Sequence, residues 1–192
     1  MAGKLVLIIG SSGVGKSVIL QALKEKHPDL HFPKSATTRE KREGEADDLY
    51  RFVTDKAFDE LHDEGKILEY AVVHGKDRYG TLVDEIIPFI DQGKIVIREV
   101  DVQGFDSIRK HRYFREEDSG YELQSIFILP ESKAQLISHI TDRAPIEEEE
   151  LNRRIASMEN ELDHAPDCDV QVTNREGKLE ESIKEVEEAI FG

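Results

Sequence analysis

The chain has little cysteine, a shortage of positive charge and no long hydrophobic run. Cys168 is the only cysteine among 192 residues, which excludes an intrachain disulfide and a cysteine-based metal cluster. The 26 basic residues are outnumbered by 41 acidic ones, so the surface as a whole should repel nucleic acid and anionic membranes. A phosphate ligand would therefore need a few concentrated cations and backbone N–H groups. This favours small anions over polymers.

No segment has the pattern of a membrane anchor or an export signal. The first four residues lead directly into a short apolar run, without the longer apolar stretch and cleavage site of a secretory signal. No apolar segment approaches the length of a transmembrane helix. Hydrophobic residues make up 38% of the chain and charged residues 35%, which suits an ordinary core under a highly charged surface. We therefore expect one globular, cytoplasmic unit that binds neither nucleic acid nor membrane.

Strand and helix patterns alternate along the chain. Leu5–Ile9, Ile95–Val102 and Ser125–Leu129 are apolar runs typical of strands buried on both faces. The other expected elements are helices at 18–26, 58–64, 83–91, 132–142, 147–162 and 179–190, and strands at 67–73 and 169–172. The polar stretch Lys34–Asp48 is expected outside the core, and Arg109–Leu123 is expected to be a loop. The alternation predicts an α/β fold with a parallel sheet and right-handed crossovers.

A glycine-rich segment follows the first predicted strand and fits G-x-x-x-x-G-K-[ST] at every fixed position. It consists of Gly10, Ser11, Ser12, Gly13, Val14, Gly15, Lys16 and Ser17. Its glycines let consecutive N–H groups point at one phosphate, and the following helix adds its positive end. Lys16 would reach the β- and γ-phosphates of a bound nucleotide, and the Ser17 hydroxyl would ligate Mg²⁺. The position between a buried strand and a helix supports a P-loop.

A P-loop alone leaves GTPases, motor ATPases and small-molecule kinases open. A GTPase usually needs a base-reading N-K-x-D segment late in the chain, and the segment 174–177 does not fit it. The chain is also small for an ATPase that works on macromolecules. A kinase of small phosphorylated substrates is favoured by size and charge.

A second set of residues suits the acceptor of such a kinase. Arg39 and Arg42 follow a hydroxyl-rich start, and with Tyr50 they could grip a phosphate through guanidinium forks and a hydroxyl. Farther on, Glu69 and Asp101 offer carboxylates. A carboxylate suits guanine because it accepts from N1–H and the exocyclic amine together, whereas adenine cannot offer both. The alternative without a functional role is that each of these charged side chains is a solvated surface residue.

Taken together, these segments resemble the guanylate kinase family from Leu5 to Ile190. The segment 127–130, Arg143, Arg154 and Asn174 after the final strand continue the resemblance. It implies a P-loop NTPase three-layer fold with three parts. These are a core (1–33, 84–138 and 156–192), a GMP-binding lobe (34–83) and a short lid (139–155) that closes over ATP.

The resemblance also implies a role for individual residues. The expected grip on the GMP phosphate consists of Ser35, Arg39, Arg42, Tyr50 and Tyr79. The expected guanine readers are Glu69 and Thr81. Glu99 and Asp101 form an acidic pair near metal and acceptor, with Asp101 and Ser17 as metal ligands. Lys16, Arg39, Arg143 and Arg154, with Mg²⁺, would neutralise the transferring phosphoryl group during direct in-line transfer from ATP to GMP or dGMP.

Two alternatives stay open at the level of sequence. One is a related P-loop kinase of another small phosphorylated acceptor, such as a sugar phosphate, supported only by an altered segment between Glu45 and Tyr50. The other is a non-catalytic guanylate-kinase-like module that binds a phosphorylated partner. Its relatives tend to have a degraded P-loop, whereas this P-loop is intact. The expected assembly is a monomer or a homodimer.

Overall fold

The computed structural model describes residues 3–46, 48–73, 75–115, 120–141 and 147–192. The chain divides into two compact units. The first contains residues 1–5, 29–98 and 103–123, and the second contains residues 6–28, 99–102 and 124–192. Within the described ranges, no helix combines the length and apolar character that a bilayer crossing requires.

The larger sheet has the strand order β6-β1-β7-β8. Its strands are β1 (Lys4–Ile9), β6 (Ile95–Glu99), β7 (Glu122–Pro130) and β8 (Val170–Asn174). The last two pair in parallel, from Ile126 opposite Val170 to Pro130 opposite Asn174. β1 carries five consecutive residues with 0% exposure, Leu5 to Ile9, as expected for a strand covered on both faces. The predicted mixed α/β fold with a parallel sheet is confirmed.

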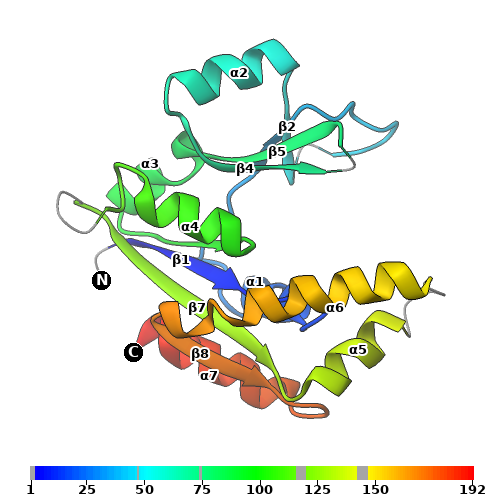
Figure 1. Ribbon diagram of the computed structural model, residues 1–192. Coiled ribbons are helices and arrows are strands. Elements are labelled where there is room, and N and C mark those ends of the chain that lie inside the picture. Colours follow the sequence, from blue (N-terminus) through cyan, green and yellow to red (C-terminus); the bar gives the residue numbers. More distant parts are fainter. Residues whose placement is uncertain (1–2, 47, 74, 116–119, 142–146) are drawn as a thin grey trace. The chain divides into compact units, whose positions relative to one another are not determined.

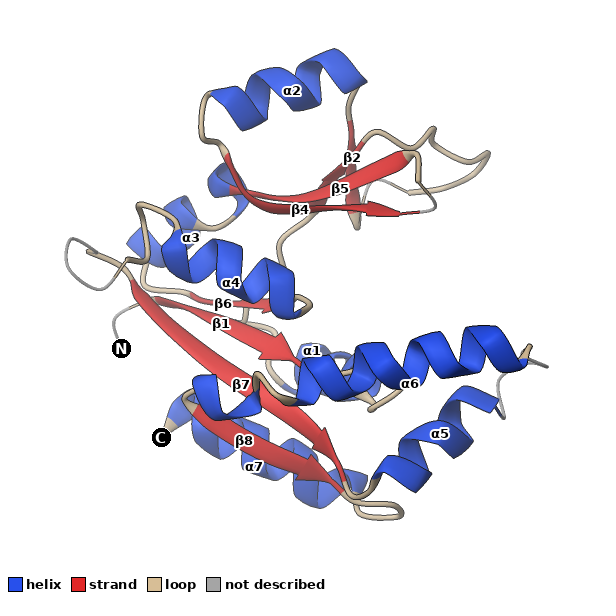
Figure 2. Cartoon of the chain, in the orientation of Figure 1, coloured by secondary structure: helices blue, strands red, loops and turns tan. Residues whose placement is uncertain are grey.

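Helices accompany this sheet in the order that the sequence predicts. In the second unit they are α1 (Lys16–Lys26), α5 (Lys133–Thr141), α6 (Glu148–Leu162) and α7 (Leu179–Phe191). Helix α7 runs along β8 (Figure 2) and buries Ile183, Val186 and Ile190. The acidic run at the start of α6 lies in its first turn, where the helix dipole favours negative charge.

The first unit contains a second sheet with the order β3-β2-β5-β4. Its strands are β2 (Ser35–Thr37), β3 (Tyr50–Phe52), β4 (Ile67–Val73) and β5 (Asp77–Leu82). Helix α2 (Asp55–Asp63) covers one face of this sheet (Figure 1). Phe58 from α2 packs there with Ala36, Ile67 and Leu82 in one buried cluster. The opposite face is therefore left for polar side chains.

The structure corrects the expectations for three strands, the end of a fourth strand and two helices. The stretch 34–48 contains β2, whose Ala36 and Thr37 are both 0% exposed, so it is not entirely outside the core. Neither β3 nor β5 was expected. The strand predicted to reach Val102 ends at Glu99, and Val102 begins α4 (Val102–Lys110), which overlaps the expected loop. The helix expected at 83–91 is divided into η1 (Val83–Glu85) and α3 (Ile87–Asp91), with Pro88 in the first turn of α3.

Candidate active site

The loop between β1 and α1 has the backbone that a phosphate cradle needs. Gly10 has φ of 147°, and a Cβ at this position would lie 2.5 Å from the Ile128 carbonyl oxygen. Gly15 has φ of 101°, and a Cβ there would lie 2.5 Å from Asn174 Nδ2. Any side chain at these two positions would be both strained and in contact with its neighbours. The loop therefore depends on glycine for its path into the helix.

Lys16 is the first residue of α1 and lies against this loop. Its Nζ donates to the carbonyl oxygens of Gly10 at 2.5 Å and Ser11 at 3.1 Å, and lies 3.7 Å from Glu99 Oε1. The side chain is only 10% exposed. Burial lowers the pKa of Lys16, and the charges of Glu99, Glu161 and Asp101 oppose that shift. A mostly buried ammonium at the entrance of a phosphate cradle can pair with phosphate oxygens.

Ser17 and Asp101 were expected to hold Mg²⁺, and both side chains are exposed in the second unit. A hydroxyl and a carboxylate are hard oxygen donors of the kind that Mg²⁺ prefers. Within the part of the chain that the structure describes, no three His, Cys, Asp or Glu side chains form a group that could hold a metal. This donor set fits an ion that takes most of its ligands from substrate phosphates and water.

Asn174 at the end of β8 supports the same loop. Its Nδ2 donates to the Val14 carbonyl oxygen at 2.8 Å, although the two residues are 160 positions apart. The segment that begins with Asn174 does not fit the GTPase motif, and the family resemblance includes Asn174 without implying a role for it. Its contact depends on the parallel pairing of β8 with β7, which a local pattern does not reveal.

Strand register brings four expected site residues into one row across the smaller sheet. Ser35 is opposite Tyr50 on one side and opposite Thr81 on the other, and Thr81 is opposite Glu69. Residues directly opposite one another point to the same face of a sheet. Tyr79, two positions before Thr81, points to this face as well. The face not covered by α2 therefore carries this polar row, named here the acceptor row: Tyr50, Ser35, Thr81 and Glu69.

Glu69 lies at the β4 end of the acceptor row, where two neighbours contact its carboxylate. The Thr81 hydroxyl donates a short hydrogen bond to Glu69 Oε1. Arg98 Nη2 from β6 lies 3.7 Å from the same oxygen. Glu69 and Arg98 are only 10% and 17% exposed, and Thr81 is fully buried. The carboxylate is held on one side by a hydroxyl and a guanidinium, and neither Arg98 nor this contact was expected from the sequence.

Arg39 is held by a carboxylate that the sequence pattern did not single out. Its guanidinium donates from both Nη atoms to Glu45, at 3.0 Å and 2.6 Å. The Arg42 N–H donates to Glu45 as well, at 3.0 Å. The hydrogen bond from Arg39 lowers the pKa of Glu45 to about 2, and the same contact raises the pKa of Arg39. The guanidinium also lies over the rings of Tyr50 and Phe52, at 5.4 Å and 5.3 Å.

This ion pair predicts a specific dependence of stability on pH. The pKa of Glu45 is depressed in the folded chain, so its stabilising contribution is complete above 4.5 and is lost as the pH falls towards about 2. Glu45→Gln should therefore unfold at lower urea concentration than the wild type at neutral pH, and the difference should shrink below pH 4.5. Glu43→Gln, an exposed change in the same loop, serves as the control. A difference that stays constant over this range would contradict the pairing.

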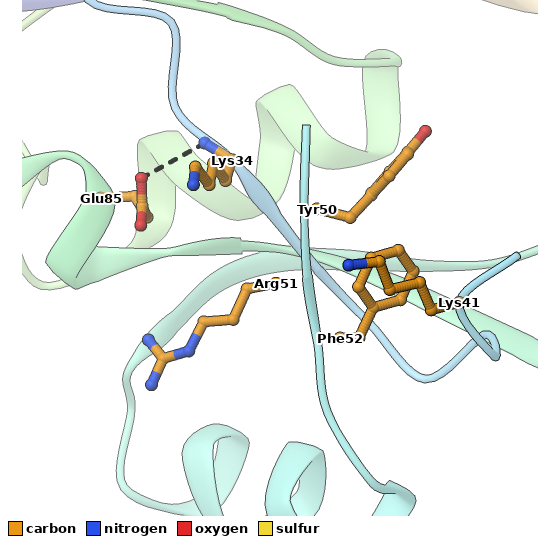
Figure 3. Close-up of a pocket in the computed structure, with 6 residues that line it drawn as sticks. All are labelled: Lys34, Lys41, Tyr50, Arg51, Phe52 and Glu85. Carbon is orange, nitrogen blue, oxygen red and sulfur yellow. Dashed lines mark hydrogen bonds between the residues drawn. The ribbon is translucent and has the colours of Figure 1, made fainter. Parts of the chain in front are cut away.

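A cavity of about 580 Å³ opens beside Tyr50 in the first unit (Figure 3). Tyr50 and Phe52 extend from one side of β3 and Arg51 from the other, as alternation along a strand requires. The six lining residues are Lys34, Lys41, Tyr50, Arg51, Phe52 and Glu85. The backbone N–H of Lys34 donates to Glu85 at 3.3 Å, and Lys41 Nζ lies 5.8 Å from the centre of the Phe52 ring. Lys41, beside the Phe52 ring, gives this side of β3 local positive charge within an acidic chain.

Of the two arginines expected to stabilise the transferring phosphoryl group, the structure describes Arg154. Arg143 lies outside the described residues. Arg154 lies in α6, in the same unit as the P-loop, with its Nε donating to Glu150 at 2.9 Å and its side chain 51% exposed. Its expected role stays a prediction.

Comparisons with known proteins agree on one family. The family model for guanylate kinase matches residues 2–192. A guanylate kinase from Thermosynechococcus vestitus is 38% identical over 98% of this chain and 94% of its own length. A guanylate kinase from Nostoc sp. is 35% identical over 100% of this chain and 92% of its own length. The crystal structure of guanylate kinase from Anaplasma phagocytophilum has a TM-score of 0.66 at 23% identity, covering 97% of this chain and 84% of that one, which supports the fold.

Proposed function

Because the chain belongs to the guanylate kinase family, we propose that it transfers the γ-phosphoryl group of ATP to the phosphate of GMP. The observation that carries the proposal is the acceptor row. It presents hydroxyl groups at Tyr50, Ser35 and Thr81 and a carboxylate at Glu69 on one face of the smaller sheet. The intact P-loop in the second unit supplies the binding site for ATP.

On the ATP side, the loop N–H groups and the start of α1 bind phosphate oxygens. Lys16 exchanges its contacts with the loop carbonyls for the β- and γ-phosphates and neutralises charge there. Ser17 and Asp101 would hold Mg²⁺, which would supply positive charge beside the phosphates when bound. Glu99 holds the Lys16 ammonium near the loop through its 3.7 Å contact.

On the acceptor side, the GMP phosphate is gripped by guanidinium and hydroxyl groups: Arg39, Arg42, Ser35, Tyr50 and Tyr79. Glu45 positions Arg39 through its paired hydrogen bonds. Charge-assisted bonds of this kind are about twice as strong as neutral ones and fix the orientation of the phosphate. The acceptor oxygen can then attack the γ-phosphorus in line, with Arg143 and Arg154 offsetting charge on the transferring group.

The base is read by Glu69 and Thr81. Guanine offers N1–H and an exocyclic amine, and both can donate to one carboxylate. Adenine instead presents an acceptor at N1, which would face the buried Glu69 charge without a hydrogen bond. The proposal therefore includes GMP and dGMP as acceptors and excludes AMP. It also includes a cytoplasmic setting, a role in purine nucleotide metabolism and a monomer or homodimer.

The two alternatives are less well supported. A phosphopartner-binding module has no need of a complete P-loop, and every fixed position of the motif is present here. A sugar phosphate acceptor gives no reason for a buried carboxylate at the end of the acceptor row. Neither rival accounts for Glu69 and Lys16 together.

A panel of acceptors tests the proposal. ADP formation from ATP and Mg²⁺ is followed with GMP, dGMP, AMP, UMP and CMP as acceptors. We expect turnover with GMP and dGMP, and little with the other three nucleotides. Equal rates with all five, or ADP formation without an acceptor, would contradict the proposal.

A further inference from the structure

We propose that Arg98 is a positioning residue for Glu69 and thereby sets the preference for bases that carry a 2-amino group. This inference rests on the proposed function and adds a residue to it. Arg98 follows three buried apolar residues of β6, Ile95 to Ile97, and is itself mostly buried. Its Nη2 lies 3.7 Å from Glu69 Oε1. Both residues belong to the same compact unit.

Burial makes this pair more consequential than a surface ion pair. Among the described residues of the first unit, most of the other ion pairs have a partner at the surface, such as Arg51 with Asp84, which are 47% and 55% exposed. Arg98 and Glu69 are 17% and 10% exposed, so each charge has lost much of its water. Removing one partner would leave the other charge buried and uncompensated. A guanidinium at this place therefore compensates the carboxylate in a mostly buried position.

The contacts also fix the direction of the carboxylate. The Thr81 hydroxyl and the Arg98 guanidinium approach the same oxygen, Oε1 of Glu69. Thr81 is fully buried on a central strand, so the position of its hydroxyl is restricted by the surrounding packing. With one oxygen held from two sides, the plane of the carboxylate cannot rotate freely. Simultaneous acceptance from N1–H and the 2-amino group of guanine requires such a fixed plane.

IMP, the nucleotide whose base is hypoxanthine, distinguishes this role from binding of the purine ring in general. IMP keeps O6 and N1–H but lacks the 2-amino group. A carboxylate that is held in place accepts a hydrogen bond from the 2-amino group of GMP, which IMP cannot donate. A carboxylate that rotates loses this hydrogen bond and therefore binds GMP and IMP more equally. Arg98 acts through Glu69, so removing it matters only while Glu69 is present.

The test measures kcat and KM with GMP, IMP and ATP for Arg98→Met, Arg98→Lys, Glu69→Gln and the double variant. For Arg98→Met we expect the ratio of kcat/KM for GMP to that for IMP to fall on the order of tenfold, with KM for ATP unchanged. Arg98→Lys, which keeps a cation near Glu69, should retain part of the ratio. The double variant should be no worse with GMP than Glu69→Gln alone. Arg109→Met, which removes an arginine paired with Asp106 in the same unit, is the matched control and should leave the ratio unchanged.

Three results would overturn the role of Arg98. One is an unchanged GMP:IMP ratio in Arg98→Met, and another is additive losses in the double variant. The third is an equal loss in Arg109→Met. If Arg98→Met does not fold, Arg98→Lys and the double variant, in which no unpaired charge is left, decide the same question. A wild-type chain that did not phosphorylate GMP would instead overturn the proposed function, so the two failures are distinguishable.

Discussion

Replacing Lys16 with methionine is expected to reduce kcat for GMP phosphorylation by at least about a hundredfold while the chain still folds. The ammonium is the cation of the P-loop, held at 2.5 Å and 3.1 Å from two loop carbonyls. Methionine has a similar length but offers no charge to the β- and γ-phosphates. Steady-state kinetics with ATP and GMP measure the loss, and thermal unfolding followed by circular dichroism measures the fold.

Lys24→Met is the matched control for this variant. Lys24 lies on the same helix, and its side chain is exposed. The control should keep wild-type kcat, because the lost charge is far along α1 from the loop. Near-normal phosphoryl transfer by Lys16→Met would mean that the P-loop does not bind the transferring phosphate.

Glu69→Gln is expected to lower kcat/KM for GMP by roughly one to two powers of ten. The amide keeps the size of the side chain but replaces a charged acceptor with a neutral group. The amide can also donate a hydrogen bond to adenine N1. The ratio of kcat/KM for GMP to that for AMP should therefore fall. Competition kinetics with both nucleotides measure this ratio directly.

Glu60→Gln tests whether the effect is specific to the acceptor row. Glu60 lies on α2, on the other face of the same sheet, and pairs with Lys56 at the surface. Its replacement should leave the GMP:AMP ratio at the wild-type value. If Glu69→Gln also left that ratio unchanged, Glu69 would not read the base.

The sequence was sufficient to predict the P-loop because each requirement of that motif is local. Gly10, Gly15, Lys16 and Ser17 lie within one turn and the start of one helix, and the flanking strand is apolar from Leu5 to Ile9. The long strand β4 also agrees with its expected bounds, Ile67–Val73. Mostly apolar runs of this length identify strands without knowledge of the partner strand.

The smaller sheet was harder to predict for a physical reason. β2 and β3 have three residues each, too few for a periodic pattern, and Ser35 and Thr37 are polar. Their burial results from pairing with β5 and from cover by other segments, which a linear sequence does not show. The same holds for Arg98 with Glu69 and for Asn174 with Val14, because these contacts join residues far apart in the chain. Family resemblance supplied the members of the acceptor row, and strand register supplied their common face.

The most direct test of the central claim follows the transferred phosphoryl group itself. The protein is incubated with Mg²⁺, GMP and ATP labelled with ³²P at the γ-phosphate, and the products are separated by chromatography. We predict that the label appears in the β-phosphate of GDP, in amounts equal to the ADP formed, with almost none released as inorganic phosphate. Label found mainly in inorganic phosphate, or no GDP at all, would contradict phosphoryl transfer from ATP to GMP.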